Sequence, residues 1–325
     1  QGHCALPRPD LVKLGAELLS VDEAKVEEAC GRTLLQGDLI EEEVDGVALV
    51  FPIHMQRAEV LIAERIRAMA ARPPDYPSID VSKAIKWCGQ QTGIELAAGQ
   101  RKAVEMALEN RLLVITGGPG VGKTTILNSI LRILQAKKVM PVLAAPTGRA
   151  ARRLSESTGL EARTIHRLLE VDGGKYRFLR KEGNPLEGDL FIVDEASMID
   201  VQLMLHFLCA LPAGAHLLIV GDVDQLPSVG AGRVLADLIE SGVVPVVRLT
   251  EIFRQASQSR IITAAHAINS GQLPNLLPPK KVADIYFIGV EDLDDIAATF
   301  LKLVKTRVRD KCGFGTMCVV LLGAR

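Results

Sequence analysis

The chain has 325 residues, enough for about two domains. It is 48% hydrophobic and 24% charged, the balance of a globular protein, which excludes a disordered chain. Aromatic residues make up only 4%, so the core has to be aliphatic. The formal net charge of −1 gives no overall positive field, and any surface for nucleic acid must therefore be local.

No stretch of the sequence reaches the about 18–20 uninterrupted apolar residues that span a bilayer, and the start lacks a basic-then-apolar signal pattern. The six cysteines lie far apart without a C-x-x-C pair, which favours free thiols over a metal site or a disulfide framework. We therefore expect a cytoplasmic protein with no membrane partner. Because the chain starts at Gln1 and stops at Arg325 after a strand-like run, we expect it to be part of a longer protein.

Residues 1–72 are predicted to form a separate helical, winged-helix-like domain. The expected elements are helices at 10–19, 22–35 and 56–71, a hairpin turn at 44–47 and a returning strand at 48–51. Such a unit binds DNA or only supports a neighbouring domain, and the acidic run 41–43 would repel phosphates. Three prolines within 73–77 end this domain and predict a linker over 73–95.

From residue 96 onward, short aliphatic strands alternate with helices. The expected strands are at 112–116, 139–145, 190–193 and 216–220, and the expected helices at 122–135, 148–156 and 201–210. This alternation predicts an α/β domain with a parallel sheet covered on both faces. Sites in such sheets lie beyond the carboxyl ends of the strands. We assign 96–270 to this domain, with an inserted hairpin at 171–188, and 271–325 to the start of a second domain.

The strongest motif, at residues 117–124, fits G-x-x-x-x-G-K-[ST] between a strand and a helix. Its glycines let the backbone curl so that N–H groups point at a phosphate chain, and the helix N-terminus adds positive potential. Lys123 can reach the β- and γ-phosphates, and the Thr124 hydroxyl can ligate Mg²⁺. The predicted nucleotide-binding residues here are Gly118, Pro119, Gly120, Val121, Gly122, Lys123, Thr124 and Thr125.

Two further strand ends carry polar residues that suit nucleotide hydrolysis. Asp194 would hold Mg²⁺ through its water shell, and Glu195 would orient and deprotonate the attacking water. Gln225 is a neutral amide that can bond both the γ-phosphate and that water. A helix N-cap with a first-turn acid is the alternative for the acidic pair, and a polar turn is the alternative for Gln225.

The motifs occur in the order of superfamily 1 helicase motifs, and two more segments resemble motif Ia of the RecD/TraA branch. The segments are 117–124, 194–197, 221–227 and 252–255 for motifs I to IV, and 145–151 and 164–169 for motif Ia. The opening, 2–7, also resembles the segment before the motor in stand-alone RecD-like helicases. The resemblance implies that 96–270 is a RecA-like P-loop NTPase domain and that 271–325 begins a second RecA-like domain. It also implies an ATP-dependent DNA helicase motor of recombination and repair, which moves 5′ to 3′.

The resemblance assigns further roles to single residues. Gln100 would read adenine through its amide, and Arg254 would contact the γ-phosphate. The predicted DNA contacts are Pro146, Thr147, Gly148, Arg149, Thr164 and His166. The inserted hairpin would split the duplex. Residues 149–181 hold nine basic and four acidic side chains, which suits a phosphate backbone, although a solvated helix face is the alternative.

Three functions stay open at this point: a helicase motor, a P-loop kinase, and a module that binds ATP and single-stranded DNA without turnover. A kinase needs a lid, and no arginine-rich lid follows the last strand. The sequence also lacks the late helicase motifs V and VI, so this chain alone is expected to turn over poorly. The expected partners are single-stranded DNA, duplex junctions and the subunits of a nuclease complex. ATPase assays with and without single-stranded DNA separate the three functions.

Overall fold

The computed structural model describes residues 2–77, 79–172, 177–251, 259–275, 284–285 and 294–303. By its internal contacts the chain divides into two units. The first comprises 1–117 and 123–250, and the second comprises 118–122 and 251–325. The first unit contains all the strands of the described residues, and each unit is described by itself below.

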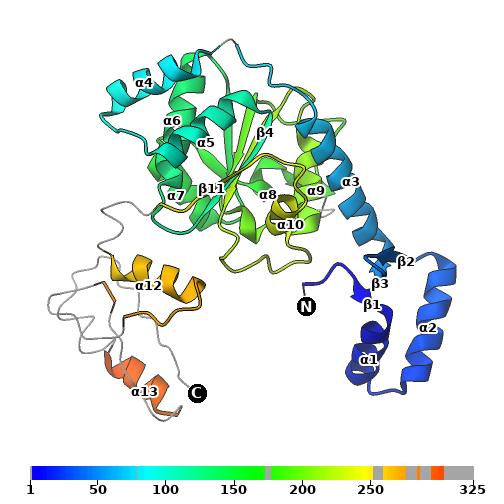
Figure 1. The fold of residues 1–325 in the computed structure, drawn as a ribbon. Helices are drawn as coiled ribbons and strands as arrows, with labels where there is room; N and C mark the ends of the chain where they lie inside the picture. Colours follow the sequence, from blue (N-terminus) through cyan, green and yellow to red (C-terminus); the bar gives the residue numbers. More distant parts are fainter. Residues whose placement is uncertain are drawn as a thin grey trace. The chain divides into compact units, whose positions relative to one another are not determined.

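The N-terminal part follows the predicted order of two helices, a hairpin and a helix. Its elements are β1 (Leu6–Pro7), α1 (Arg8–Leu19), α2 (Glu23–Gln36), β2 (Leu39–Val44), β3 (Val47–Pro52) and α3 (Ile53–Ala70). Asp45 and Gly46 turn the hairpin with φ of 51° and 78°, the left-handed pair that an Asp-Gly turn favours. β1 adds a third antiparallel strand in the order β1-β3-β2 (Figure 1), and its two residues are too few to show a period in the sequence.

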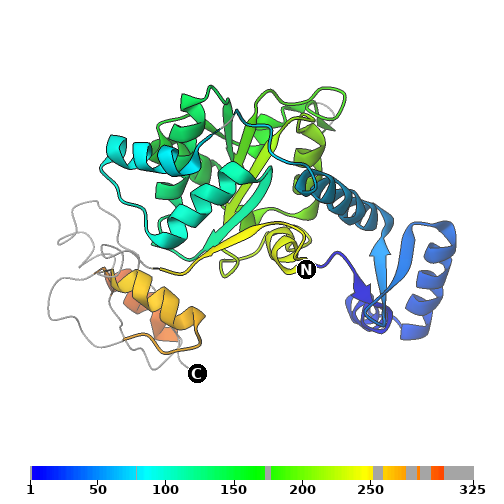
Figure 2. The ribbon, with the colours of Figure 1, turned by 45° about the horizontal axis from the view of Figure 1, so that its top comes forward.

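Helix α3 joins the N-terminal part to the larger domain. Ala58, Ile62 and Ile66, spaced four residues apart, form a buried stripe in the main hydrophobic core. They pack against α9 (Val201–Ala210), and Figures 1 and 2 show α3 running alongside that helix. The expected boundary after residue 72 is therefore not a break in the core.

The larger domain is built on a six-stranded parallel sheet, which confirms the α/β class. In spatial order the strands are β11 (Val246–Leu249), β4 (Leu112–Gly117), β10 (His216–Gly221), β9 (Leu190–Val193), β5 (Pro141–Ala145) and β6 (Ala162–Thr164). The helices around it include α5 (Ala98–Glu109), α6 (Lys123–Ala136), α7 (Gly148–Thr158), α8 (Ile165–Leu168), α9 and α10 (Val234–Glu240). Figure 2 shows the sheet between these helices. Every residue of β9 and β10 is buried, as expected for strands covered on both faces.

The segment 73–95, expected to be a linker, contains helix α4 (Val81–Thr92). Asp80 caps it by accepting a hydrogen bond from the backbone N–H of Lys83 at 3.0 Å. Cys88 is buried, and α4 packs on α6. The prolines end one helix as predicted, but the capping signal that follows them starts another.

An extended strap, residues 73–77, fastens α3 to the amino-terminal edge of the sheet. The Tyr76 ring stacks on His216, the first residue of β10, with centroids 3.7 Å apart. The Asp75 carboxylate lies 3.1 Å from His216 Nε2 and 3.5 Å from Arg111, which precedes β4. The strap thus binds the sheet through charge and stacking.

The predicted insertion contains a short antiparallel pair, β7 (Val171–Asp172) and β8 (Arg177–Phe178). The Phe178 ring lies edge-on to His206 and 5.8 Å from His166, which holds this hairpin near α8 and α9. In the second unit the described helices are α12 (Arg260–Asn269) and α13 (Asp294–Leu303). The strand expected at 317–322 lies outside the described residues. Within the described part, no helix combines the length and the apolar character needed to cross a membrane.

Candidate active site

The three predicted nucleotide motifs start at the carboxyl ends of three neighbouring strands. β10 lies between β4 and β9, with Gly221 paired to Thr116 and Ile219 paired to Val193. The chain therefore leaves the sheet side by side at Gly117, Asp222 and Asp194. Sequence order alone does not reveal this adjacency, because β4 and β9 do not pair directly.

The phosphate loop adopts a backbone that requires glycine. Gly120 and Gly122 have φ of 78° and 84°, and α6 begins directly after them at Lys123. The Lys123 ammonium donates a hydrogen bond to the carbonyl oxygen of Gly117 at the end of β4. The remaining predicted residues vary in exposure: Pro119 and Thr124 are exposed, Gly118 and Thr125 are half-buried, and Val121 is buried.

Asp194 and Glu195 form an electrostatically coupled pair beside Lys123. Asp194 continues the ladder from β9, since its N–H donates to the carbonyl of Ala144 at 3.0 Å. Burial raises the pKa of Asp194, and the neighbouring Glu195 charge raises it further, whereas a backbone N–H bond from Glu195 and the charge of Lys123 lower it. The Lys123 charge acts on Asp194, so the lysine and the acidic pair share one site.

Glu195 has a left-handed backbone, with φ of 53° and ψ of 40°. This conformation costs a non-glycine residue about 1–2 kcal/mol, and such strain gathers at functional sites. Gly221 packs behind this turn: a Cβ there would lie 2.7 Å from Leu235 Cδ2 and 3.2 Å from the backbone N of Ala196. The sequence gives no signal for this role of Gly221, because the contact depends on how β10 meets the turn after β9.

Gln225 lies on the turn after β10 and is tied to Asp222. The buried Asp222 carboxylate accepts a hydrogen bond from the backbone N–H of Asp224 at 3.1 Å through one oxygen. Its other oxygen accepts from Gln225 Nε2 at 3.4 Å. The Gln225 side chain itself is exposed, and Asp222 was not among the predicted site residues.

Gln100 is buried at the start of α5. Its Oε1 accepts a hydrogen bond from the backbone N–H of Ala97 at 3.1 Å, so the oxygen caps its own helix. Its Nε2 is buried and has no partner among the residues that the structure describes. A buried donor without a partner costs free energy, which a hydrogen bond to a ligand would recover. Arg254, the predicted γ-phosphate contact, lies outside the described residues.

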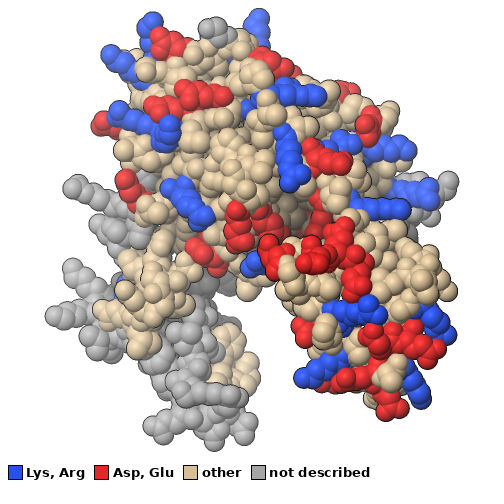
Figure 3. Space-filling view, turned by 45° about the vertical axis from the view of Figure 1, so that its right-hand side comes forward, with Lys and Arg blue, Asp and Glu red and all other residues tan. Residues whose placement is uncertain are grey.

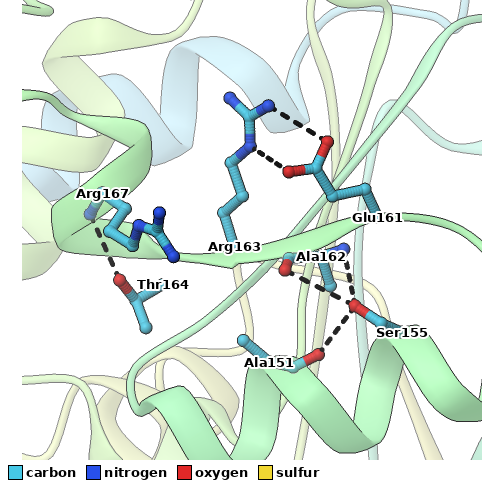
Figure 4. A network of polar contacts seen from close by, with 7 residues as sticks. All are labelled: Ala151, Ser155, Glu161, Ala162, Arg163, Thr164 and Arg167. Atoms are coloured by element: carbon cyan, nitrogen blue, oxygen red, sulfur yellow. Dashed lines mark hydrogen bonds and ion pairs between the residues drawn. The ribbon is translucent and has the colours of Figure 1, made fainter.

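The predicted DNA-contacting residues gather farther along the same edge of the sheet. β5 pairs with β6, and Ala145 opposes Thr164. Thr147 caps α7 by accepting from the Ala150 N–H at 3.2 Å. Thr164 caps α8 by accepting from the Arg167 N–H, also at 3.2 Å (Figure 4). Two helix N-termini therefore lie at neighbouring strand ends. Pro146 is half-buried, whereas Gly148, Arg149 and His166 are exposed beside them.

The basic stretch is partly neutralised within the fold. Arg152 pairs with Glu156, Arg163 with Glu161 (Figure 4), and Arg180 with Glu170, each at 2.8 Å. The exposed side chains Arg149, Arg153 and Arg167 form no ion pair with any described residue. Figure 3 shows basic and acidic side chains interspersed over one face of the described surface. The ion pairs therefore neutralise part of the positive charge counted over residues 149–181.

Comparisons with known proteins agree with these motifs. A family model described as an AAA domain matches residues 100–231. An ATP-dependent RecD2 DNA helicase of Deinococcus radiodurans is 36% identical over 283 residues, 84% of this chain and 38% of that protein. The RecBCD enzyme subunit RecD of Mycolicibacterium smegmatis is 43% identical over 165 residues, 43% of this chain and 30% of that protein. A solved Pif1 helicase of Candida albicans has 22% identity and a TM-score of 0.45, over 66% of this chain and 56% of that one.

The chain is similar in sequence to RecD-type DNA helicases. It spans 38% of the length of the Deinococcus relative and 30% of the Mycolicibacterium relative. The six-stranded parallel sheet and the AAA-domain match over residues 100–231 confirm the RecA-like P-loop fold expected from the sequence.

The residues present in this site fit Mg²⁺ bound together with a nucleotide. The donors offered by Thr124 and Asp194 are hard oxygen atoms, which Mg²⁺ prefers. Among the described residues there is no group of three or more His, Cys, Asp or Glu side chains that could hold a metal ion alone. Mg²⁺ typically takes one or two protein ligands and completes its shell with phosphate oxygens and water, which this donor set allows.

Proposed function

We propose that the protein is an ATP-dependent DNA helicase motor that translocates 5′ to 3′ along single-stranded DNA in recombination or repair. The observation that supports this most strongly is the adjacency of β4, β10 and β9, whose ends bring the phosphate loop, Gln225 and the acidic pair to one edge of the sheet. The candidate DNA contacts follow β5 and β6 at the same edge.

ATP would bind with its phosphates on the loop backbone and on Lys123, which exchanges the Gly117 carbonyl for phosphate oxygens. The Nε2 of Gln100 would donate to the adenine ring. Thr124 and Asp194 would hold Mg²⁺. When bound, this ion would neutralise part of the negative charge of the phosphates.

Glu195 would accept the proton of the attacking water, and Gln225 would orient that water against the γ-phosphate. Arg254 would stabilise the charge that develops on the transferred group. The proposed base and metal ligand are consecutive residues, and the Glu195 charge acts on Asp194.

Single-stranded DNA would lie across the N-termini of α7 and α8. The positive potential of these helix N-termini and the exposed Arg149 and His166 suit a phosphate backbone. Aromatic side chains are scarce here, so backbone contacts rather than base stacking would dominate. The hairpin of β7 and β8 would split the duplex at a junction.

Because the Mycolicibacterium relative is named a subunit of the RecBCD enzyme, nuclease-complex subunits are further proposed partners. The cytoplasm is the proposed location.

The test is strand separation by the full-length protein on two duplexes that differ only in carrying a 5′ or a 3′ single-stranded tail. We expect ATP-dependent separation of the 5′-tailed duplex, and no separation with Lys123→Ala, because that variant lacks the cation for the phosphates. Separation of the 3′-tailed duplex alone would contradict the polarity, and separation of neither would contradict the helicase function.

A further inference from the structure

The site contains a buried carboxylate, Asp222, to which the sequence-based account gives no role. Only 2% of Asp222 is exposed, although it directly follows β10 at the edge of the sheet. Both carboxylate oxygens are engaged, one by the Asp224 N–H and the other by Gln225 Nε2. A buried carboxylate is costly unless it is hydrogen-bonded, so this arrangement has to serve the turn or the site.

The Asp222 carboxylate oxygen is the acceptor of this hydrogen bond, and the contact orients the Gln225 amide. The NH₂ group must face Asp222, and Oε1 must be directed away from it. One hydrogen of Nε2 is used on Asp222, and the other remains available. The exposed Gln225 side chain would otherwise be free to rotate and to present either end of its amide.

The rest of the turn is fastened independently of this bond. Ser228 Oγ donates to the carbonyls of Gly230 and Gly232 at 3.0 and 2.9 Å. Val201 N–H, at the start of α9, donates to the Ala231 carbonyl at 3.0 Å. Between 222 and 225 the backbone is closed by the Gln225 N–H, which donates to the Asp222 carbonyl at 3.3 Å, so the side-chain bond adds a restraint on the Gln225 amide itself.

We propose that Asp222 is a positioning residue, which holds Gln225 so that Oε1 accepts a hydrogen bond from the attacking water and the second Nε2 hydrogen meets a γ-phosphate oxygen. This inference rests on the proposed function, because it assumes that Gln225 acts in ATP hydrolysis. Asp222 itself touches neither the water nor the phosphate.

The experiment measures DNA-stimulated ATP turnover and the Kd of a non-hydrolysable ATP analogue in the full-length protein. The variants are Asp222→Ala, Asp222→Asn, Gln225→Ala and the double alanine variant. We expect Asp222→Ala to lower kcat about 10-fold with a Kd within about 2-fold of wild type, and the double variant to be no slower than Gln225→Ala. Asp222→Asn should also lower kcat, because its single acceptor oxygen cannot serve both the Asp224 N–H and Gln225 Nε2.

Asp224→Asn is the matched control, since the contact of Asp224 with Asp222 runs through its backbone N–H. It should leave kcat and Kd unchanged. A spectroscopic readout independent of turnover is the side-chain amide NMR signal of Gln225. This signal should move to the position of a free glutamine in Asp222→Ala but not in Asp224→Asn.

Normal turnover in a folded Asp222→Ala protein would overturn the proposal, as would an additive loss in the double variant. A lower melting temperature together with weaker nucleotide binding and a lower kcat would also overturn it, because that combination indicates a purely structural role. Should Asp222→Ala fail to fold, the nearly isosteric Asp222→Asn decides by the same criteria. A wild-type protein without DNA-stimulated hydrolysis would instead contradict the proposed function, so the two failures are distinguishable.

Discussion

At the scale of single residues, the sequence proposes which side chains act, but not which residues support them. Lys123 and Thr124 follow from a motif with fixed spacing, because the phosphate loop dictates which side chains reach the phosphates. Gly221 and Asp222 have no such local signal. Their roles arise from contacts with Ala196 and Gln225, which only the paired strands bring within reach.

Replacing Glu195 by Gln tests the assignment of the general base. The amide keeps the size of the side chain but cannot accept the proton of the water, so we expect unchanged nucleotide affinity and hydrolysis slowed by about 100-fold or more. Equilibrium binding of a fluorescent ATP analogue and steady-state phosphate release measure the two effects. Hydrolysis at the wild-type rate would show that another group is the base.

Gly221→Ala tests the close packing behind the acidic turn. A methyl group there would lie 2.7 Å from Leu235 Cδ2, so we expect a loss of about 1–3 kcal/mol in the free energy of unfolding and slower ATP turnover. Gly31→Ala, in helix α2 with nothing within 4 Å of the added Cβ, is the control and should be neutral or stabilising. Equal stability of both variants in chemical denaturation would refute the packing argument.

At the scale of elements, periodicity and capping residues predicted most helices and strands, and contacts between elements decided the rest. The hairpin at Asp45 and Gly46 and the first two helices follow from local signals. Helix α4 was missed because the prolines before it dominate the local pattern. The strap could not be predicted either, since its stacking partner His216 lies 140 residues further along the chain than Tyr76.

The strap predicts a pH dependence of stability. Burial lowers the pKa of His216 below its ordinary 6.5, and Arg111 lowers it further, whereas Asp75 and Asp189 raise it. Tyr76 stacks on the same ring. His216 therefore binds a proton less readily in the folded state than in the unfolded state. The free energy of unfolding should be level above about pH 7.5 and fall as the pH drops through about 6.5.

His216→Gln should make this slope shallower, and urea denaturation between pH 5.5 and 8 measures it. His206, whose pKa burial also lowers, is present in both proteins, so the difference between them isolates His216. The same slope in the variant and in the wild type would show that His216 does not titrate as described.

The edge formed by α7 and α8 predicts an effect of Arg149 on DNA binding. Arg149→Ala should weaken single-stranded DNA binding equally for all sequences and lower the slope of log K against log salt by about 0.7. Arg152→Ala, on the same helix but already paired with Glu156, is the control and should have a smaller effect. Fluorescence anisotropy at several salt concentrations measures both, and equal slopes would argue against a phosphate contact at Arg149.

At the scale of the whole molecule, the class of the fold could be predicted from the sequence, but the order of the strands in the sheet could not. Alternating buried strands and helices indicate a parallel sheet, yet the position of β10 between β4 and β9 is set by packing. Helix α3 was assigned to a separate domain because its apolar stripe does not show which core it enters. Its buried residues Ile62 and Ile66 belong to the same core as α9.

ATP hydrolysis by the full-length protein, measured with and without single-stranded DNA, tests most directly whether this sheet edge is the site of a DNA-dependent motor. We predict that DNA stimulates hydrolysis and that Lys123→Ala abolishes it together with nucleotide binding. Hydrolysis indifferent to DNA, or phosphate transfer to a small acceptor instead of water, would contradict the account.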